Sequence, residues 1–235
     1  MLKTRILVVE DEAIVAEDIG RSLLNLGYAV ASKVSSGKEA IKKVEETNPN
    51  LVLMDIVLKG DMDGIETAKQ IKTLFDIPIV YLTAFSDEKT LERAKITEPF
   101  GYIVKPFRER ELHIIIEMAL FKHSIEKKLK ESREWFRVTL KSIGDAVIAT
   151  DPEGYVLFMN PVAQSMIGWK QEDARGRPLK EIFNIVYEKA GEGQGSHTIL
   201  ISKDNKRVSI RENSDAIKDE KGNIIGLVLV FSEIS

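Results

Sequence analysis

The chain has no cysteine among its 235 residues, which excludes disulfide bonds, zinc sites built on thiolates and flavin photosensors that use a cysteine. It also lacks a long apolar run, since stretches such as Leu227–Phe231 fall far short of the roughly 20 residues that cross a membrane. No signal-like segment is complete before the acids at positions 10–12. A formal net charge of −3 offers no basic surface for nucleic acid. We therefore expect a cytoplasmic protein that binds neither membranes nor nucleic acid.

The most informative stretch that is present is Leu51–Asp55, a short apolar run that ends on a carboxylate. Such a run is too short for a helix and is typical of a buried strand in a parallel sheet. A second run, Arg5–Val9, leads into Glu10 and Asp11. If these strands are neighbours, their acids meet at one edge and repel each other unless a cation binds. All-oxygen ligands favour Mg²⁺, although the acids after the first strand could instead simply begin a helix.

Two further apolar strands also end on polar residues. Ile79–Leu82 is followed by Thr83, and Gly101–Val104 is followed by Lys105. Ligands bind beyond the carboxyl ends of the strands in open parallel sheets. A hydroxyl and an ammonium group placed there, beside a metal, would suit the oxygens of a phosphoryl group.

Together these residues resemble the receiver domain of two-component response regulators, over residues 1–121. The matching pieces, in chain order, are Glu10–Asp11, Asp55, Asp63–Gly64, Thr83–Ala84, Tyr102 and Lys105–Pro106. Strands alternate with helical segments expected at 11–26, 37–48, 63–75 and 87–96, which predicts a parallel sheet covered on both faces. We expect a flavodoxin-like, doubly wound sheet of five strands in the order 2-1-3-4-5, which places the first and third strands side by side.

The resemblance implies that Asp55 accepts a phosphoryl group from the phosphohistidine of a sensor histidine kinase. It further implies that Glu10, Asp11, Asp55 and the backbone carbonyl of Val57 hold Mg²⁺. Such a domain is no enzyme in the ordinary sense, because it catalyses only its own phosphorylation and dephosphorylation.

Three other residues take roles from the same resemblance. Lys105 would pair with the phosphoryl oxygens, and Thr83 would hydrogen-bond one of them. Tyr102 matches the aromatic residue that changes rotamer together with Thr83. The loop Ile56–Gly64 departs from the family, because it lacks the usual proline and is one residue longer. This departure bears on the rate of phosphoryl loss and not on the identity of Asp55.

A helix is expected over 109–142, where neither glycine nor proline occurs. Its apolar or small residues follow an eleven-residue rhythm and are Met118, Phe121, Ile125, Leu129, Ser132, Phe136, Leu140 and Ile143. The helix could pack on its own domains. It could also form a homodimer, which we favour because a helix that is polar on most sides needs a partner. We divide the chain into a receiver (1–121), a linker helix (122–142) and a further domain (133–235).

The last domain resembles a PAS domain, a smaller α+β fold with an antiparallel sheet. The matching segments are Asp145–Val147, Asp151–Gly154, Asn160–Ala163, Gly168–Trp169, Gly176–Leu179 and Gly222–Gly226. Residues 184–196 contain three glycines and are expected to form a loop in place of a longer helix, so the domain looks shortened. No histidine lies where a haem-binding PAS domain needs one, and His197 is expected on the surface. We expect no PAS cofactor.

The leading interpretation is a response regulator that signals through the helix to the PAS domain and a downstream protein partner that the sequence does not identify. The alternative is the receiver–PAS front of a hybrid sensor histidine kinase, although His123 lacks the acid and proline expected beside a phospho-accepting histidine. A metal-dependent phosphohydrolase would need a second acid where Val57 stands. A nucleotide-binding flavodoxin-like site is disfavoured because Glu10 and Asp11 would repel a phosphate.

Overall fold

A computed structural model describes residues 3–84, 88–189 and 196–234. The chain divides into two compact units, Met1–Lys130 and Glu131–Ser235. Each unit has its own sheet and its own core, and each is described by itself below.

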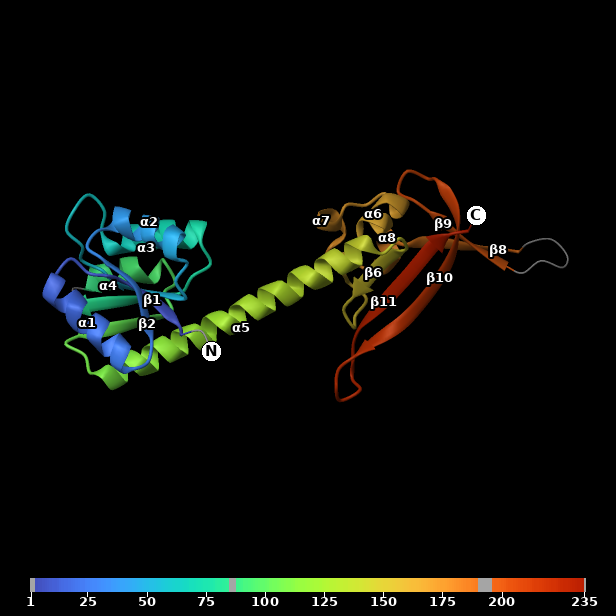
Figure 1. Ribbon diagram of the computed structural model, residues 1–235. Coiled ribbons are helices and arrows are strands. Elements are labelled where there is room, and N and C mark those ends of the chain that lie inside the picture. Colours follow the sequence, from blue (N-terminus) through green and yellow to red (C-terminus); the bar gives the residue numbers. More distant parts are fainter. Residues whose placement is uncertain (1–2, 85–87, 190–195, 235) are drawn as a thin grey trace. The chain divides into compact units, whose positions relative to one another are not determined.

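The first unit is built on a parallel sheet, drawn in blue to green in Figure 1. Its strands are β1 (Arg5–Val9), β2 (Ala29–Val34), β3 (Leu51–Asp55), β4 (Ile79–Ala84) and β5 (Gly101–Lys105). They lie in the order β2-β1-β3-β4-β5, which confirms the predicted topology. In the register of the central pair, Val9 lies opposite Met54. The residues that follow β1 and those that end β3 therefore share one edge of the sheet.

Helices cover both faces of this sheet and create two cores. The helices are α1 (Ala13–Asn25), α2 (Gly37–Thr47), α3 (Gly64–Leu74), α4 (Glu88–Lys95) and α5 (Glu109–Ser142). Helices α2, α3 and α4 pack on one face, against residues such as Val52 and Met54. Helices α1 and α5 pack on the other, against Leu51 and Leu53. Alternate residues of β3 thus face opposite cores, so the strand is apolar throughout.

The helix α5 begins and ends at the residues that the sequence predicted. Leu112, Ile116 and Ala119 are buried on the receiver sheet. Tyr28 fixes the same part of the helix, because its hydroxyl donates to Glu117 Oε1 at 2.6 Å and lies 2.8 Å from His113 Nδ1. Beyond position 124 the helix is exposed as far as residue 138.

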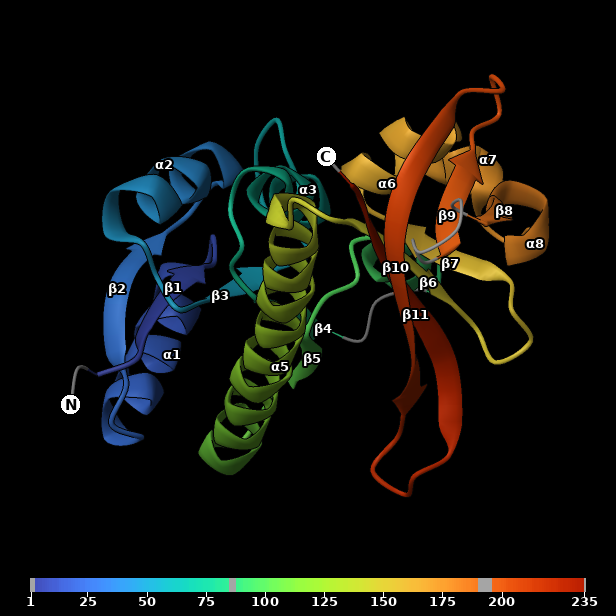
Figure 2. The ribbon, with the colours of Figure 1, turned by 90° about the vertical axis from the view of Figure 1, so that its right-hand side faces the viewer.

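The second unit is an antiparallel sheet with three short helices, drawn in yellow to red in Figures 1 and 2. The strands are β6 (Ala146–Thr150), β7 (Val156–Met159), β8 (Asn184–Lys189), β9 (Ser196–Ile201), β10 (Arg207–Lys218) and β11 (Ile224–Glu233). Their order is β7-β6-β11-β10-β9-β8. The expectation of a loop over 184–196 was wrong for its first half, because residues 184–189 form β8 and pair with β9. Residues 190–195 and the exposure of the His197 side chain lie outside what the structure describes.

The helices α6 (Pro161–Ile167), α7 (Gln171–Ala174) and α8 (Leu179–Ile182) share one apolar core with this sheet. Asn160 is fully buried at the start of α6. Its Oδ1 accepts from the backbone N–H of Ala163 at 2.9 Å and of Val147 at 3.0 Å. Its amide donates to the carbonyl of Asp145 at 2.8 Å and, at 3.3 Å, to that of Leu140 in α5. This single side chain caps one helix and ties the end of another to the sheet.

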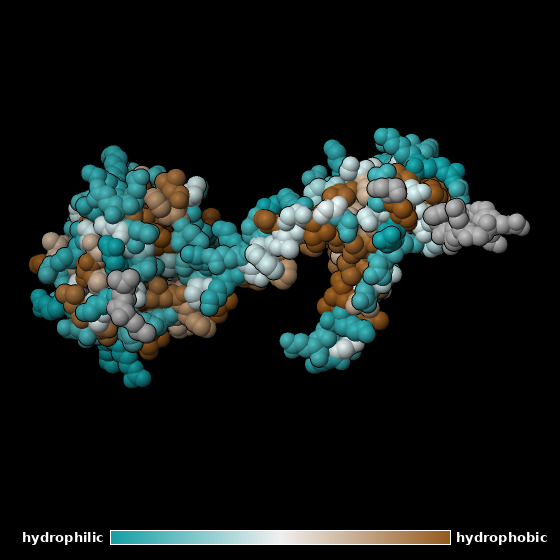
Figure 3. All heavy atoms as spheres, turned by 45° about the vertical axis from the view of Figure 1, so that its right-hand side comes forward, coloured by the Kyte–Doolittle hydropathy of each residue, from teal (hydrophilic) through white to brown (hydrophobic). Residues whose placement is uncertain are grey.

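Apolar side chains are also exposed on the long β10–β11 hairpin. Ile217, Ile224, Ile225 and Leu227 are each more than one third exposed, and brown, hydrophobic side chains lie over this hairpin in Figure 3. No helix in the described part of the chain combines the length and the apolar character that a bilayer span requires.

Candidate functional site

The C-terminal edge of the parallel sheet brings together the acids predicted from the sequence. Glu10 follows β1 and Asp55 ends the neighbouring β3, and both side chains are almost completely buried. Oxygens of Glu10, Asp11 and Asp55 all lie within 4.8 Å of one another. Three carboxylates so close together repel strongly unless cations compensate them.

This acidic cluster fits a hard divalent cation. Glu10 Oε1 is buried and has no hydrogen-bond partner among the described residues, so an oxygen lone pair is available inside the cluster. Desolvation raises the pKa of Glu10, and the Asp55 charge adds to this rise although Lys105 opposes it. A ligand set made only of oxygens is what Mg²⁺ prefers. The backbone carbonyl of Val57 stays a predicted ligand. The N–H of the same residue donates to Asp55 Oδ1 at 3.0 Å.

Lys105 lies between two of the three acids. Its Nζ is 2.5 Å from Glu10 Oε2 and 2.6 Å from Asp55 Oδ2. Burial would lower the pKa of Lys105, but the hydrogen bonds and charges of Asp55 and Glu10 outweigh this and hold the pKa above its ordinary value. The ammonium group is therefore a fixed cation beside the proposed phospho-acceptor.

Thr83 and Tyr102 lie on the adjoining strands β4 and β5. Thr83 is buried close to the end of β4. The rings of Tyr81 and Tyr102 are 5.8 Å apart, and the Tyr102 hydroxyl is buried without a hydrogen-bond partner in the part of the chain that the structure describes. Its burial raises the pKa of the phenol. A side chain that leaves a buried hydroxyl unpaired is not tightly fixed by polar contacts, which suits the predicted change of rotamer.

The loop after β3 holds contacts that the sequence did not reveal. Lys59 forms an ion pair with Asp11 at 2.8 Å. Asp63 caps α3 by accepting from the Glu66 N–H at 2.8 Å, and its other oxygen pairs with Arg93 at 2.7 Å. The cap agrees with the helix expected from position 63, whereas Lys59 and Arg93 are exposed side chains whose partners no sequence pattern marks.

Gly64 explains why this loop ends on the Asp-Gly pair. A Cβ atom at this position would lie 1.8 Å from the carbonyl oxygen of Asp55. Only glycine lets the start of α3 approach the end of β3 so closely. The residue therefore positions the backbone on both sides of the acidic cluster.

Comparison with known proteins agrees with this geometry. Residues 6–117 match the family model of the response regulator receiver domain, and residues 134–234 match that of the PAS fold. The transcriptional regulatory protein PdtaR of Mycobacterium tuberculosis is 38% identical over 116 residues, which are 49% of this chain and 56% of PdtaR. The transcriptional regulatory protein ResD of Bacillus subtilis is 36% identical over 118 residues, or 50% of this chain and 48% of ResD.

The chain thus spans about half the length of these curated relatives. A solved structure, the signal receiver domain of a modulated diguanylate cyclase from Desulfovibrio desulfuricans, is 37% identical, with a TM-score of 0.52. The match covers 53% of this chain and 99% of that domain. Residues 6–117 therefore belong to the response regulator receiver family and residues 134–234 to the PAS family.

Proposed function

We propose that this chain is a response regulator in which Asp55 accepts a phosphoryl group from the phosphohistidine of a sensor histidine kinase. The observation that carries the proposal is the meeting of Glu10, Asp11, Asp55 and Lys105 at one edge of the sheet. A carboxylate oxygen of Asp55 attacks phosphorus, and the phosphorus–nitrogen bond of the donor breaks. The imidazole keeps the electron pair and later takes a proton, so the donor returns as histidine.

The other site residues stabilise the transferred group. Bound Mg²⁺ would neutralise charge on the phosphoryl oxygens, and Glu10, Asp11, Asp55 and the carbonyl of Val57 would hold it. Lys105 already contacts Asp55, so its ammonium group can pair with a phosphoryl oxygen after transfer. The chain then catalyses only its own phosphorylation and dephosphorylation, and it meets its kinase in the cytoplasm.

Intact-mass spectrometry tests the phosphorylation directly. Incubation with acetyl phosphate and Mg²⁺ should add one phosphoryl group to the chain. The Asp55→Asn variant and a sample without Mg²⁺ should stay at the unmodified mass. A phosphoryl group that still appears on Asp55→Asn would contradict the assignment of the acceptor.

The output that we propose is a change in dimerisation and in protein binding, relayed by α5 to the PAS unit. Apolar side chains of α5 are between 49% and 67% exposed and follow one stripe; they are Met118, Phe121, Ile125, Leu129 and Phe136. Pairing of two copies along this stripe would cover them. The names of PdtaR and ResD refer to transcription, but we propose no nucleic-acid binding, because their similarity covers only about half of this chain.

The dimer has its own test. Molar mass from light scattering should correspond to a dimer at micromolar concentrations, and addition of the phosphate mimic should shift the equilibrium. Replacing Ile125 and Leu129 by glutamate should give a monomer, whereas Lys127→Glu with Lys141→Glu, on the opposite side of the helix, should not. A monomer at every concentration would refute the pairing.

A further inference from the structure

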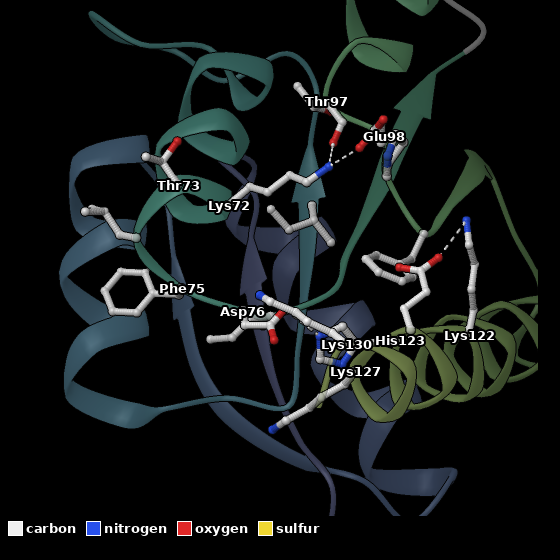
Figure 4. A pocket seen from close by; sticks show the side chains of 16 residues that line it. Lys72, Thr73, Phe75, Asp76, Thr97, Glu98, Lys122, His123, Lys127 and Lys130 are labelled. Carbon is white, nitrogen blue, oxygen red and sulfur yellow. Dashed lines mark hydrogen bonds and ion pairs between the residues drawn. The ribbon is translucent and has the colours of Figure 1, made fainter. Parts of the chain in front are cut away.

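A hollow of about 770 Å³ opens at the edge of the receiver sheet opposite to Asp55. The segment before β4, the segment before β5, the end of α3 and the outer part of α5 line it (Figure 4). These segments precede strands whose other ends carry Thr83 and Lys105. The acidic cluster therefore lies at the far end of the strands and belongs to a different site.

The lining of this hollow has more cations than anions. Its lysines are Lys72, Lys122, Lys127 and Lys130, and its acids are Asp76, Glu98 and Glu126. Each acid already has a partner. Glu98 pairs with Lys72 at 2.7 Å, Asp76 lies 3.2 Å from His123 Nε2, and Glu126 lies 3.8 Å from Lys122.

Apart from His123, four lysines against three acids leave the lining with a net charge of +1. Within the described ranges, neither Lys127 nor Lys130 has a carboxylate at ion-pair distance, and both belong to the part of α5 that lines the hollow (Figure 4). They lie three residues apart, so they share one face of the helix. Two ammonium groups facing a concave surface attract a ligand that carries several negative charges.

Aromatic and apolar side chains also line the hollow. Phe75, Ile77 and Phe100 line it together with the charged residues. The Phe100 ring packs edge-on against His123 at 5.4 Å, and Lys122 Nζ lies 5.3 Å from its centroid. Aromatic side chains and lysines in the same lining suit a ligand that has both a ring system and phosphate groups.

Glu98, which also lines the hollow, has an unusual backbone conformation. Its φ angle is +46°, in the left-handed region that glycine and asparagine adopt more easily. Its carboxylate holds Lys72, which also donates to the Thr97 carbonyl at 3.1 Å. A phosphate in the pocket would compete with this carboxylate for Lys72.

We propose that this pocket binds a nucleotide. Its phosphates would contact Lys127, Lys130 and Lys72, and its ring would pack on the aromatic side chains of the lining. Its volume falls in the range of small-molecule sites, roughly 300–1,000 Å³. The α5 wall of the pocket lies just beyond Ala119, the last buried residue of that helix. A bound nucleotide adds contacts between the receiver core and the first exposed turns of α5, which gives the chain a second input beside phosphorylation.

Calorimetric titration of the full chain with ATP in the absence of Mg²⁺ tests this site. We expect binding tighter than about 1 mM, the upper end of ordinary metabolite affinities. The double variant Lys127→Glu/Lys130→Glu should weaken it by at least about tenfold, because it reverses two positive charges of the pocket lining. The matched control Lys128→Glu/Lys141→Glu makes the same change in net charge outside the pocket and should bind as the wild type does. No binding up to that concentration, or equal weakening in both variants, overturns the proposal.

Two further measurements separate this site from the rest of the molecule. Glu98→Asn should tighten ATP binding more than Glu45→Gln does, because it frees Lys72 and eases the backbone, whereas Glu45→Gln makes the same change in net charge away from the pocket. Equal tightening in the two variants contradicts a role of Lys72 in this pocket. Tripolyphosphate, which lacks the ring, should bind more weakly than ATP, and equal affinity overturns the assignment to a nucleotide. Asp55→Asn should bind ATP unchanged, so failure of the phosphorylation proposal does not affect this test.

Discussion

Replacing Lys105 by methionine should destabilise the receiver unit and make it more dependent on Mg²⁺. The ammonium group contacts Glu10 at 2.5 Å and Asp55 at 2.6 Å, and its side chain is only 20% exposed. Removing one partner of a fully buried ion pair costs about 3–5 kcal/mol. Because solvent still reaches Lys105, we expect a loss of about 2–4 kcal/mol in the metal-free protein. The carboxylates that remain lie within 4.8 Å of one another, where each pair repels by about 3 kcal/mol at an effective dielectric constant of about 20.

Mg²⁺ should recover more stability in this variant than in the wild type, because the variant has no other cation between Glu10 and Asp55. A ligand at ten times its Kd stabilises by about 1.4 kcal/mol, and tighter binding adds to this. Amide hydrogen exchange in β1 and β3 reports the opening free energy of the receiver separately from that of the PAS unit. Lys59→Met, which removes an exposed partner of Asp11, is the control and should change this free energy little. A loss below about 1 kcal/mol, or an equal Mg²⁺ effect in variant and wild type, would refute the role of Lys105 as the internal counterion.

Other substitutions probe the contacts around the site and along α5. Gly64→Ala should destabilise the receiver by about 3 kcal/mol and slow phosphorylation, because the added Cβ overlaps the Asp55 carbonyl. Hydrogen exchange of the β3 amides measures the loss of stability, and the rate of mass gain measures phosphorylation. Tyr28→Phe should cost about 1–2 kcal/mol, read from the α5 amides of residues 113–119, because its two polar partners lose a hydrogen bond. Asn160→Ala should cost the PAS unit about 3 kcal/mol through the lost helix cap and buried hydrogen bonds, seen as faster exchange in β6. Lys59→Met should tighten Mg²⁺ binding a few-fold, measured by calorimetry, since the metal no longer competes with an ammonium group for Asp11. Unchanged values in these assays would count against each contact in turn.

The sheet order and the acidic cluster were predictable from the sequence for one physical reason. Buried parallel strands are short apolar runs, so their ends are visible, and ligands meet where such strands end. The sequence alone therefore places Glu10, Asp55 and Lys105 at one edge. The contacts of Lys59 and Arg93 could not be found in this way, because exposed side chains choose partners through loop conformation.

The strand β8 shows how composition can mislead. Glycines at positions 191, 193 and 195 favoured a loop over the whole of 184–196. The first six residues nevertheless include Ile185, Val186 and Tyr187, which are good strand formers. Their pairing with β9 was decided by an available strand edge, which is a tertiary property.

The unbroken course of α5 limits how one unit can influence the other. Residues Glu109–Ser142 form a single helix that contains no glycine or proline. The helix therefore has no residue at which a kink would be expected. In the relay that we propose, a small rotation imposed near His113 would reach Leu140 only as long as the helix between them stays intact. Because the Leu140 carbonyl accepts from the buried Asn160, that rotation would act on the start of α6 and on the first strand of the PAS sheet.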